Sequence, residues 1–432
     1  MSKQKDVQHL AYVDIQHDAL AVFDDVEQGV VLREDIWISG YKAGSTSVHG
    51  KARVDFQEGG GSTLTSREGV EVDRISKTNF VVSVPKLGVR NVPLKFPKHV
   101  IHPPYKKSSP LDPPLQINSL SLNPKSAHIV LGGPDGYAII VPTSSDSNVE
   151  KDSVRLKGHV GDVRDVKWFP SGEVILTASS DLSLRVFGRD GINPRTFKGH
   201  TRAITSTAIL GVGKQIVSGS KDGTIRLWDV GRGTEVKKWI VEGKKGVEAV
   251  VIVEDEEGLR ALGLHNQERA MLVGTHERIW VQPFEGEGWW ASESEEEGHM
   301  VCLAYDAESG TVVTGHTNGV SAIQDITTLS KDAEIKSITR IRRNHSPIYS
   351  LAFGLSATHE EGSGAREGRV DLYAGTAAGL PCHLTLGKDA EGGYVAKVEE
   401  EVAGWEAVGV ECFAVGKDGV WCAGGEGGLR RY

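Results

Sequence analysis

Short runs of alternating apolar and polar residues dominate this chain, and few stretches show the periodicity of a long helix. In the first 90 residues these runs are AYVDIQHDALAVF, GVVLREDIWISG, KARVDF and VEVDRISKTNFVVSV. A period of two is typical of strands that bury one face. We therefore expect residues 1–92 to form a small β-rich domain, interrupted by the flexible run Gly59-Gly60-Gly61-Ser62.

A proline-rich connection follows at residues 93–114, where seven of the sixteen prolines of the chain occur. Proline fixes φ and has no amide hydrogen, so this stretch can form an edge strand but not a central one.

From residue 115 onward the pattern repeats about every 40 residues. Two Gly-His pairs and two acidic turn residues recur 41 positions apart, which is the Gly-His to Trp-Asp signature of a four-stranded propeller blade. Seven copies, of decreasing regularity, predict an all-β fold with a seven-bladed WD-repeat β-propeller at residues 115–432. The clearest copies contain Gly158-His159 with Asp181, and Gly199-His200 with Asp222 and Trp228-Asp229.

The last copy ends at Arg431-Tyr432, in the third strand of its blade. Its outermost strand is expected from residues 94–112, which would close the ring and remove two exposed edges.

The histidines of the repeat are interpreted as structural. Each can reach a strand hydroxyl, such as Ser218 or Ser220, and through it the turn residue Asp222 and the indole of Trp228. Such a network pairs polar groups that would each cost about 1–3 kcal/mol if buried without a partner. The residues assigned to this blade network are His159, Asp181, His200, Ser218, Ser220, Asp222, Trp228 and, in the fifth copy, His299.

Composition and charge restrict the chemistry of the chain. The four cysteines lack the spacing of a metal site. The net charge of -9 argues against nucleic-acid binding, which needs a basic face. No apolar signal core begins the chain, and no apolar run is long enough to span a membrane. We expect an intracellular protein without catalytic residues, cofactor or metal.

Several strings resemble the proteasomal ATPase-associated factor family: DVRDVKWFPSG (162–172), FKGH (197–200), AITSTAI (203–209), VSGSKDGTIRLWDVG (217–231) and the terminal GGLRRY. The resemblance covers residues 115–432 and implies a non-catalytic assembly chaperone, monomeric on its own, in the cytoplasm and nucleus. Such a chaperone would bind the C-terminal domain of one ATPase subunit of the proteasome regulatory-particle base. It would meet other base subunits and chaperones indirectly, and leave before the 26S particle is complete.

Acidic residues suggest which surface would bind this partner. In a propeller, the loop before each innermost strand and the tight turn between the second and third strands lie on one face. We expect this face to bind a basic surface, mainly by speeding and orienting association, with Trp289, Trp290 or Trp405 as anchors or as blade packing. The acids expected there are Asp135, Glu295, Glu296, Glu297, Glu399, Glu400, Glu401 and Glu426.

Two other functions are compatible with a propeller. A substrate receptor or scaffold of a ubiquitin ligase or signalling complex would carry an adaptor-binding helix or motif outside the ring, and the β-patterned N-terminus offers none. A propeller enzyme would place metal ligands or acid pairs around the central channel, and the inner-strand stretches contain no HxH, HExxH or paired-carboxylate repeat. Both alternatives stay open.

Overall fold

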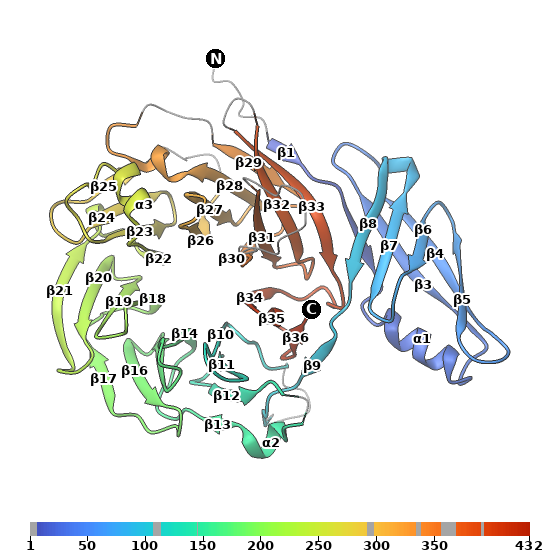
Figure 1. The fold of residues 1–432 in the computed structure, drawn as a ribbon, viewed down its shortest axis with the longest axis horizontal. Coiled ribbons are helices and arrows are strands. Elements are labelled where there is room, and N and C mark those ends of the chain that lie inside the picture. The colour runs from blue at the N-terminus through green and yellow to red at the C-terminus, as the bar shows by residue number, and fades with distance from the viewer. Residues whose placement is uncertain are drawn as a thin grey trace, which may run out of the picture.

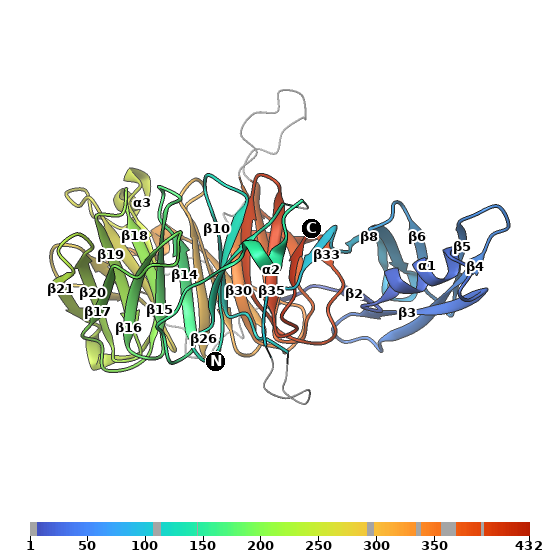
Figure 2. The same ribbon diagram turned by 90° about the horizontal axis from the view of Figure 1, so that it is seen from below.

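Seven four-stranded blades surround a central axis, and an N-terminal β module lies beside the ring (Figure 1). Seen from its edge, the ring is a disc with the module at its rim (Figure 2). The structure, a computed structural model, describes residues 7–106, 114–144, 146–291, 298–333, 338–355, 369–389 and 393–432. The predicted all-β propeller fold is confirmed.

Blades one to four each use four consecutive strands, innermost first. They are β10 (Ser119–Leu122), β11 (His128–Gly132), β12 (Ala138–Pro142) and β13 (Val154–Arg155); β14 (Val163–Trp168), β15 (Val174–Ser179), β16 (Ser183–Gly188) and β17 (Arg195–Lys198); β18 (Ile204–Leu210), β19 (Gln215–Ser220), β20 (Thr224–Asp229) and β21 (Thr234–Ile240); β22 (Val247–Val253), β23 (Ala270–Thr275), β24 (Ile279–Pro283) and β25 (Trp289–Ala291). The connecting helices are α2 (Val149–Asp152), η2 (Glu242–Lys244) and α3 (Glu256–Ala261).

Blades five to seven also receive strands from the N-terminal part of the chain. Their own strands are β26 (Met300–Asp306), β27 (Thr311–His316), β28 (Val320–Asp325) and β29 (Thr339–Arg342); β30 (Ile348–Phe353), β31 (Arg369–Thr376), β32 (Cys382–Lys388) and β33 (Tyr394–Val402); and β34 (Val410–Gly416), β35 (Gly419–Gly424) and β36 (Leu429–Arg431), with η3 (Ile326–Leu329) after β28. On the outside of blade five, β1 (Val7–His9) pairs in parallel with β29.

The ring is closed by β9 (His99–Ile101), which lies in the proline-rich segment. This strand pairs antiparallel with β36, with Ile101 opposite Leu429. Just before it, the amide of Lys98 donates to the carbonyl of Arg431 at 2.8 Å. The outermost strand of blade seven therefore comes from a distant part of the chain, since the paired residues Ile101 and Leu429 are 328 positions apart. The pairing covers the edge that β36 would otherwise expose.

The N-terminal module has two sheets around one apolar core. One sheet contains β2 (Tyr12–Ile15), β3 (Arg33–Tyr41), β4 (Val48–Phe56) and β5 (Ser62–Arg67); the other contains β6 (Glu71–Arg74), β7 (Asn79–Val84) and β8 (Val89–Lys95), with η1 (Pro85–Leu87) between the last two. Because β8 pairs in parallel with β33, the second sheet continues blade six. The boundary expected at residue 92 falls inside β8.

One strand prediction in this module is wrong. The second half of AYVDIQHDALAVF forms the helix α1 (Ala19–Glu27). Ala19, Val22, Phe23 and Val26 recur at helical spacing and are all buried against the sheets, so one helix face serves the core. Among the helices of the described residues, none is long and apolar enough to cross a membrane.

Candidate partner-binding face

The loop that enters each blade contacts the tight turn of the blade before it, and together these segments form one face of the ring, here called the turn face. The turn after β11 shows how close the contact is. At Gly136, a Cβ atom would lie 2.0 Å from the carbonyl oxygen of His159. At Gly223, it would lie 2.6 Å from the backbone of Lys244. Both glycines have positive φ, 74° and 75°, so glycine meets a steric and a conformational requirement there.

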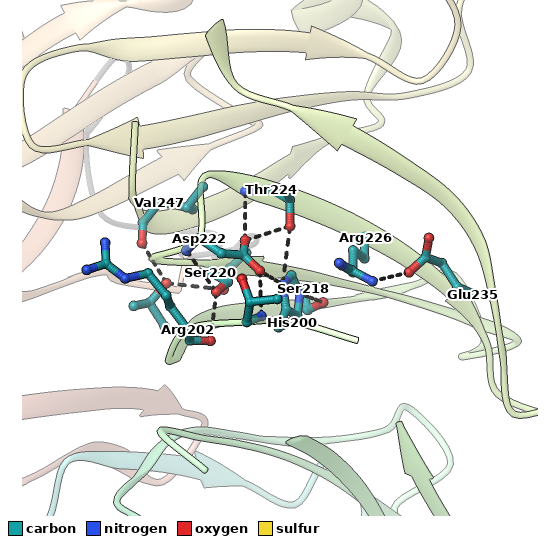
Figure 3. Close-up of polar contacts among 12 residues, drawn as sticks. His200, Arg202, Ser218, Ser220, Asp222, Thr224, Arg226, Glu235 and Val247 are labelled. Carbon is teal, nitrogen blue, oxygen red and sulfur yellow. Dashed lines mark hydrogen bonds and ion pairs between the residues drawn. The ribbon is translucent and has the colours of Figure 1, made fainter. Parts of the chain in front are cut away.

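A buried polar network supports the turn face in blade three (Figure 3). The His200 ring contacts Asp222 Oδ2 through Nδ1 at 2.9 Å and Ser218 Oγ through Nε2 at 2.8 Å. The indole of Trp228 donates to Ser218 Oγ at 2.8 Å. All these polar atoms are paired when Nδ1–H donates to Asp222 and the Ser218 hydroxyl donates to Nε2. Ser220 joins the network through Asp222 and not through the His200 ring: its hydroxyl accepts the amide of Asp222 at 3.1 Å and donates to the carbonyl of Arg202 at 2.9 Å.

Blade two repeats the arrangement with a threonine. His159 contacts Asp181 Oδ2 at 2.8 Å and Thr177 Oγ1 at 2.7 Å. Burial lowers the pKa of His159 below its ordinary 6.5, even though Asp181 opposes this effect. Burial alone would raise the pKa of Asp222, but hydrogen bonds from His200 and Thr224 hold it well below its usual range. These groups hold blade turns in place, because each is enclosed and committed to its partners.

His299 lies outside any such network, so its assignment is corrected. His299 directly precedes β26, as Asp162 directly precedes β14. His159, the histidine of the network in blade two, lies three residues earlier in its loop than Asp162. The side chain of His299 is exposed, and its amide donates to a hydroxyl of the neighbouring turn. The buried histidine of blade five is His316, whose Nε2 lies 2.9 Å from Thr314 Oγ1. The Gly-His dipeptide matched the motif, but the strand register does not.

Glu399, Glu400 and Glu401 do not lie in the loop before blade seven, which corrects their predicted place. They belong to β33, whose last two residues pair with β8. The Glu400 carboxylate lies 3.4 Å from Lys95 Nζ, and Glu401 forms a buried ion pair with Arg343. Glu400 and Glu401 therefore join the module to the ring, whereas Glu399 pairs with Lys397 and accepts the Thr385 hydroxyl within blade six. None of the three is part of the turn face.

Asp135 and Glu426 do lie in tight turns of the turn face, and each lies beside an acid that had not been predicted. The Asp135 amide donates to Asp162 Oδ1 at 3.4 Å, and the Glu406 amide donates to Glu426 Oε1 at 2.6 Å. Glu426 also pairs with Arg430. The position of Asp162 directly before the innermost strand β14 is a signal that the sequence contains. The remaining predicted acids, Glu295, Glu296 and Glu297, lie outside the described residues.

The three tryptophans considered as anchors are engaged in packing. Trp405 is 5% exposed, with the Arg430 guanidinium 3.9 Å from its ring centroid. Trp289 donates to the carbonyl of Leu329 at 2.9 Å, and Trp290 packs edge-on against Trp280 in the same blade.

The central channel has a hollow of about 480 Å³ lined by inner strands of blades one, two, five, six and seven. Its acids have structural partners. Asp165 pairs with Lys167 at 2.6 Å and accepts the Thr207 hydroxyl at 2.7 Å, which ties blade two to blade three. Burial raises the pKa of Glu411, whose carboxylate accepts from Gln116. Within the described ranges, no group of three or more His, Cys, Asp or Glu side chains could hold a metal ion.

Comparison with known proteins agrees with this architecture. Residues 151–187 and 191–229 match the family described as WD domain, G-beta repeat. The chain is 37% identical over 108 residues to the 26S proteasome regulatory subunit RPN14 of Saccharomyces cerevisiae, covering 25% of each protein. It is 32% identical over 121 residues to eukaryotic translation initiation factor 3 subunit I of Schizosaccharomyces pombe, covering 28% of this chain and 35% of that one.

A third relative is nuclear distribution protein nudF 1 of Talaromyces marneffei, 31% identical over 134 residues, or 30% of this chain and 28% of that protein. The chain thus aligns with about a quarter to a third of the length of these relatives. From its fold, its matched repeats and its relatives, this chain is a WD-repeat β-propeller protein.

Proposed function

We propose that this protein is a non-catalytic assembly chaperone of the proteasome regulatory particle. It binds the C-terminal domain of one base ATPase subunit and leaves before the 26S proteasome is complete. The observation that carries the proposal is the similarity to a proteasome regulatory subunit, RPN14, at 37% identity over 108 residues. The resemblance of the blade strings to the proteasomal ATPase-associated factors supports the same function.

The turn face offers this partner two acidic pairs, Asp135 with Asp162 and Glu406 with Glu426. Asp135 is exposed, and the side chain of Glu406 is 72% exposed, with His17 as a distant partner at 3.8 Å. Exposed charges of this kind each contribute little to affinity, about 0–1 kcal/mol, so they act chiefly on association rate and orientation. A basic surface on the ATPase domain is the complement we expect.

Affinity purification of the tagged protein from cells, followed by mass spectrometry, tests this function. We expect base ATPase subunits to be enriched without the proteolytic core, and the tagged protein to be found in the cytoplasm and nucleus. Recovery of translation initiation factor 3 subunits would contradict the proposal and follow the second relative instead. Recovery of cullin adaptors would favour a ubiquitin-ligase receptor.

A further inference from the structure

A basic hollow of about 590 Å³ opens on the turn face where the loops of blades three, four and five meet. Its volume is in the range of about 300–1,000 Å³ that is usual for ligand sites. It is a local reversal of charge on a chain whose net charge is -9. Its lining residues are Arg202, Ala203, Lys221, Lys244, Lys245, Gly246, Thr275, His276, Glu277 and His299.

Carboxylates neutralise only some of these cations. Glu248, whose side chain is 12% exposed, pairs with both Lys221 and His276 at the wall of the hollow. Lys245 pairs with Glu277 at 2.7 Å, and both side chains are about half exposed. The hollow thus has carboxylates that fix the position of some of its cations.

Arg202 and Lys244 are the cations left over. Both are exposed, and neither side chain has a carboxylate partner within the described residues. In Figure 3 the Arg202 guanidinium points away from the buried network of His200 and Asp222. Two positive charges therefore line the hollow without an ion pair to any described carboxylate.

The backbone that carries Lys244 is held in place. Its φ of 51° lies in the left-handed region, which is unusual for lysine, and its amide donates to the carbonyl of Val241 at 2.8 Å. Its backbone packs against Gly223 of blade three, where no other side chain would fit. Residues held in this region are found preferentially at binding sites, and a rigid loop loses less entropy when a ligand binds.

We propose that this basic hollow, defined by Arg202, Lys221, Lys244 and Lys245, binds an acidic segment of a protein partner. Aspartate and glutamate side chains fit its size and its excess charge. A nucleic acid fits less well, because a long polyanion would also meet the negative charge of the rest of the chain. The inference goes beyond the proposed function, since it concerns acidic peptides whatever protein supplies them.

Fluorescence anisotropy with fluorescein-labelled octaglutamate tests the site on the whole protein, without any ATPase subunit. We expect octaglutamate to bind with an affinity that falls as salt rises, and octaglutamine not to bind. The variant Arg202→Glu with Lys244→Glu should weaken octaglutamate binding by roughly tenfold or more. If this variant melts at a lower temperature than the unmodified protein, the milder Arg202→Gln with Lys244→Gln replaces it and should also weaken octaglutamate binding.

A matched control carries the same charge change elsewhere. Lys198→Glu with Lys238→Glu alters two exposed lysines on the outermost strands β17 and β21, neither of which lines the hollow. This control should bind octaglutamate within about twofold of the unmodified protein, since exposed charges outside the hollow are screened by solvent and salt. Equal weakening by both variants, no binding at low salt, or tighter binding of a single-stranded oligonucleotide of the same charge would overturn the proposal.

Discussion

Arg343 and Glu401 form an ion pair, 2.5 Å from Nη2 to Oε2, where the N-terminal module meets the ring. Their side chains are only 8% and 5% exposed. The second carboxylate oxygen of Glu401 accepts the amide of Val13 at 3.3 Å, and the Arg343 guanidinium lies over the ring of Tyr12. One ion pair thus joins β2, β33 and the loop that enters blade six.

Glu401→Gln should reduce the free energy of unfolding by about 3–5 kcal/mol, because it leaves the Arg343 charge buried without its partner. Urea unfolding measures this change. Glu256→Gln is the control, since its pair with Arg260 on α3 is exposed and should contribute about 0.5 kcal/mol or less. Equal, small losses for both variants would show that the junction does not depend on the buried pair.

Ile101→Ala tests the closure of the ring by β9. Ile101 is 3% exposed and packs in the core shared by blades seven and one, so its truncation should cost about 2–5 kcal/mol. Amide hydrogen exchange in Leu429–Arg431 should also become faster, because β36 loses support from its outer neighbour. Val100→Ala, at a position 39% exposed on the same strand, should leave exchange in β36 nearly unchanged.

Ser218→Ala tests the blade network. Its hydroxyl serves both His200 and Trp228, so the variant leaves two buried polar groups without their partner and should cost about 1–3 kcal/mol. Thr201→Ala is the control, because it removes a hydroxyl from the exposed loop beside His200. It should have little effect on the melting temperature. A tolerant Ser218 site would count against the structural role of the network.

Acid should destabilise the protein in two stages. Because the pKa of His159 is lowered in the folded state, the unfolded chain binds more protons just below pH 6.5, and the free energy of unfolding falls as the pH drops from there. The lowered pKa values of Asp181 and Asp222 act in the same direction below their ordinary 3.8. Urea unfolding at pH 7.5, 6 and 5 measures the first stage. His159→Gln should show a smaller decrease over this range, and an unchanged slope would contradict the assignment.

The repeat made the blades and the network of His200 predictable, since each contact there spans one hairpin and recurs at fixed spacing. The position of His299 was not predictable from the dipeptide, because the register of β26 with β27 decides which residue enters the network. Glu401 was placed wrongly for a related reason. Its burial depends on Arg343, 58 residues earlier, and on Val13 in another sheet.

The basic hollow also could not be read from the sequence. Arg202 and His299 both line it although 97 positions separate them in the sequence, and no local motif links them. Net charge pointed to an acidic binding surface, whereas the turn face has both acidic pairs and a basic hollow. Only the order of blades around the ring brings the cations together.

The most direct test of the account is a titration of the whole protein with the purified C-terminal domains of the base ATPase subunits. One domain should bind, and Asp135→Asn with Glu406→Gln should weaken this binding and reduce its dependence on salt. The control, Glu173→Gln with Glu308→Gln, removes the same charge from exposed turns after β14 and β26, on the opposite face, and should bind like the unmodified protein. If no domain binds, or if both variants bind with unchanged affinity and salt dependence, the turn face is not the chaperone surface proposed here.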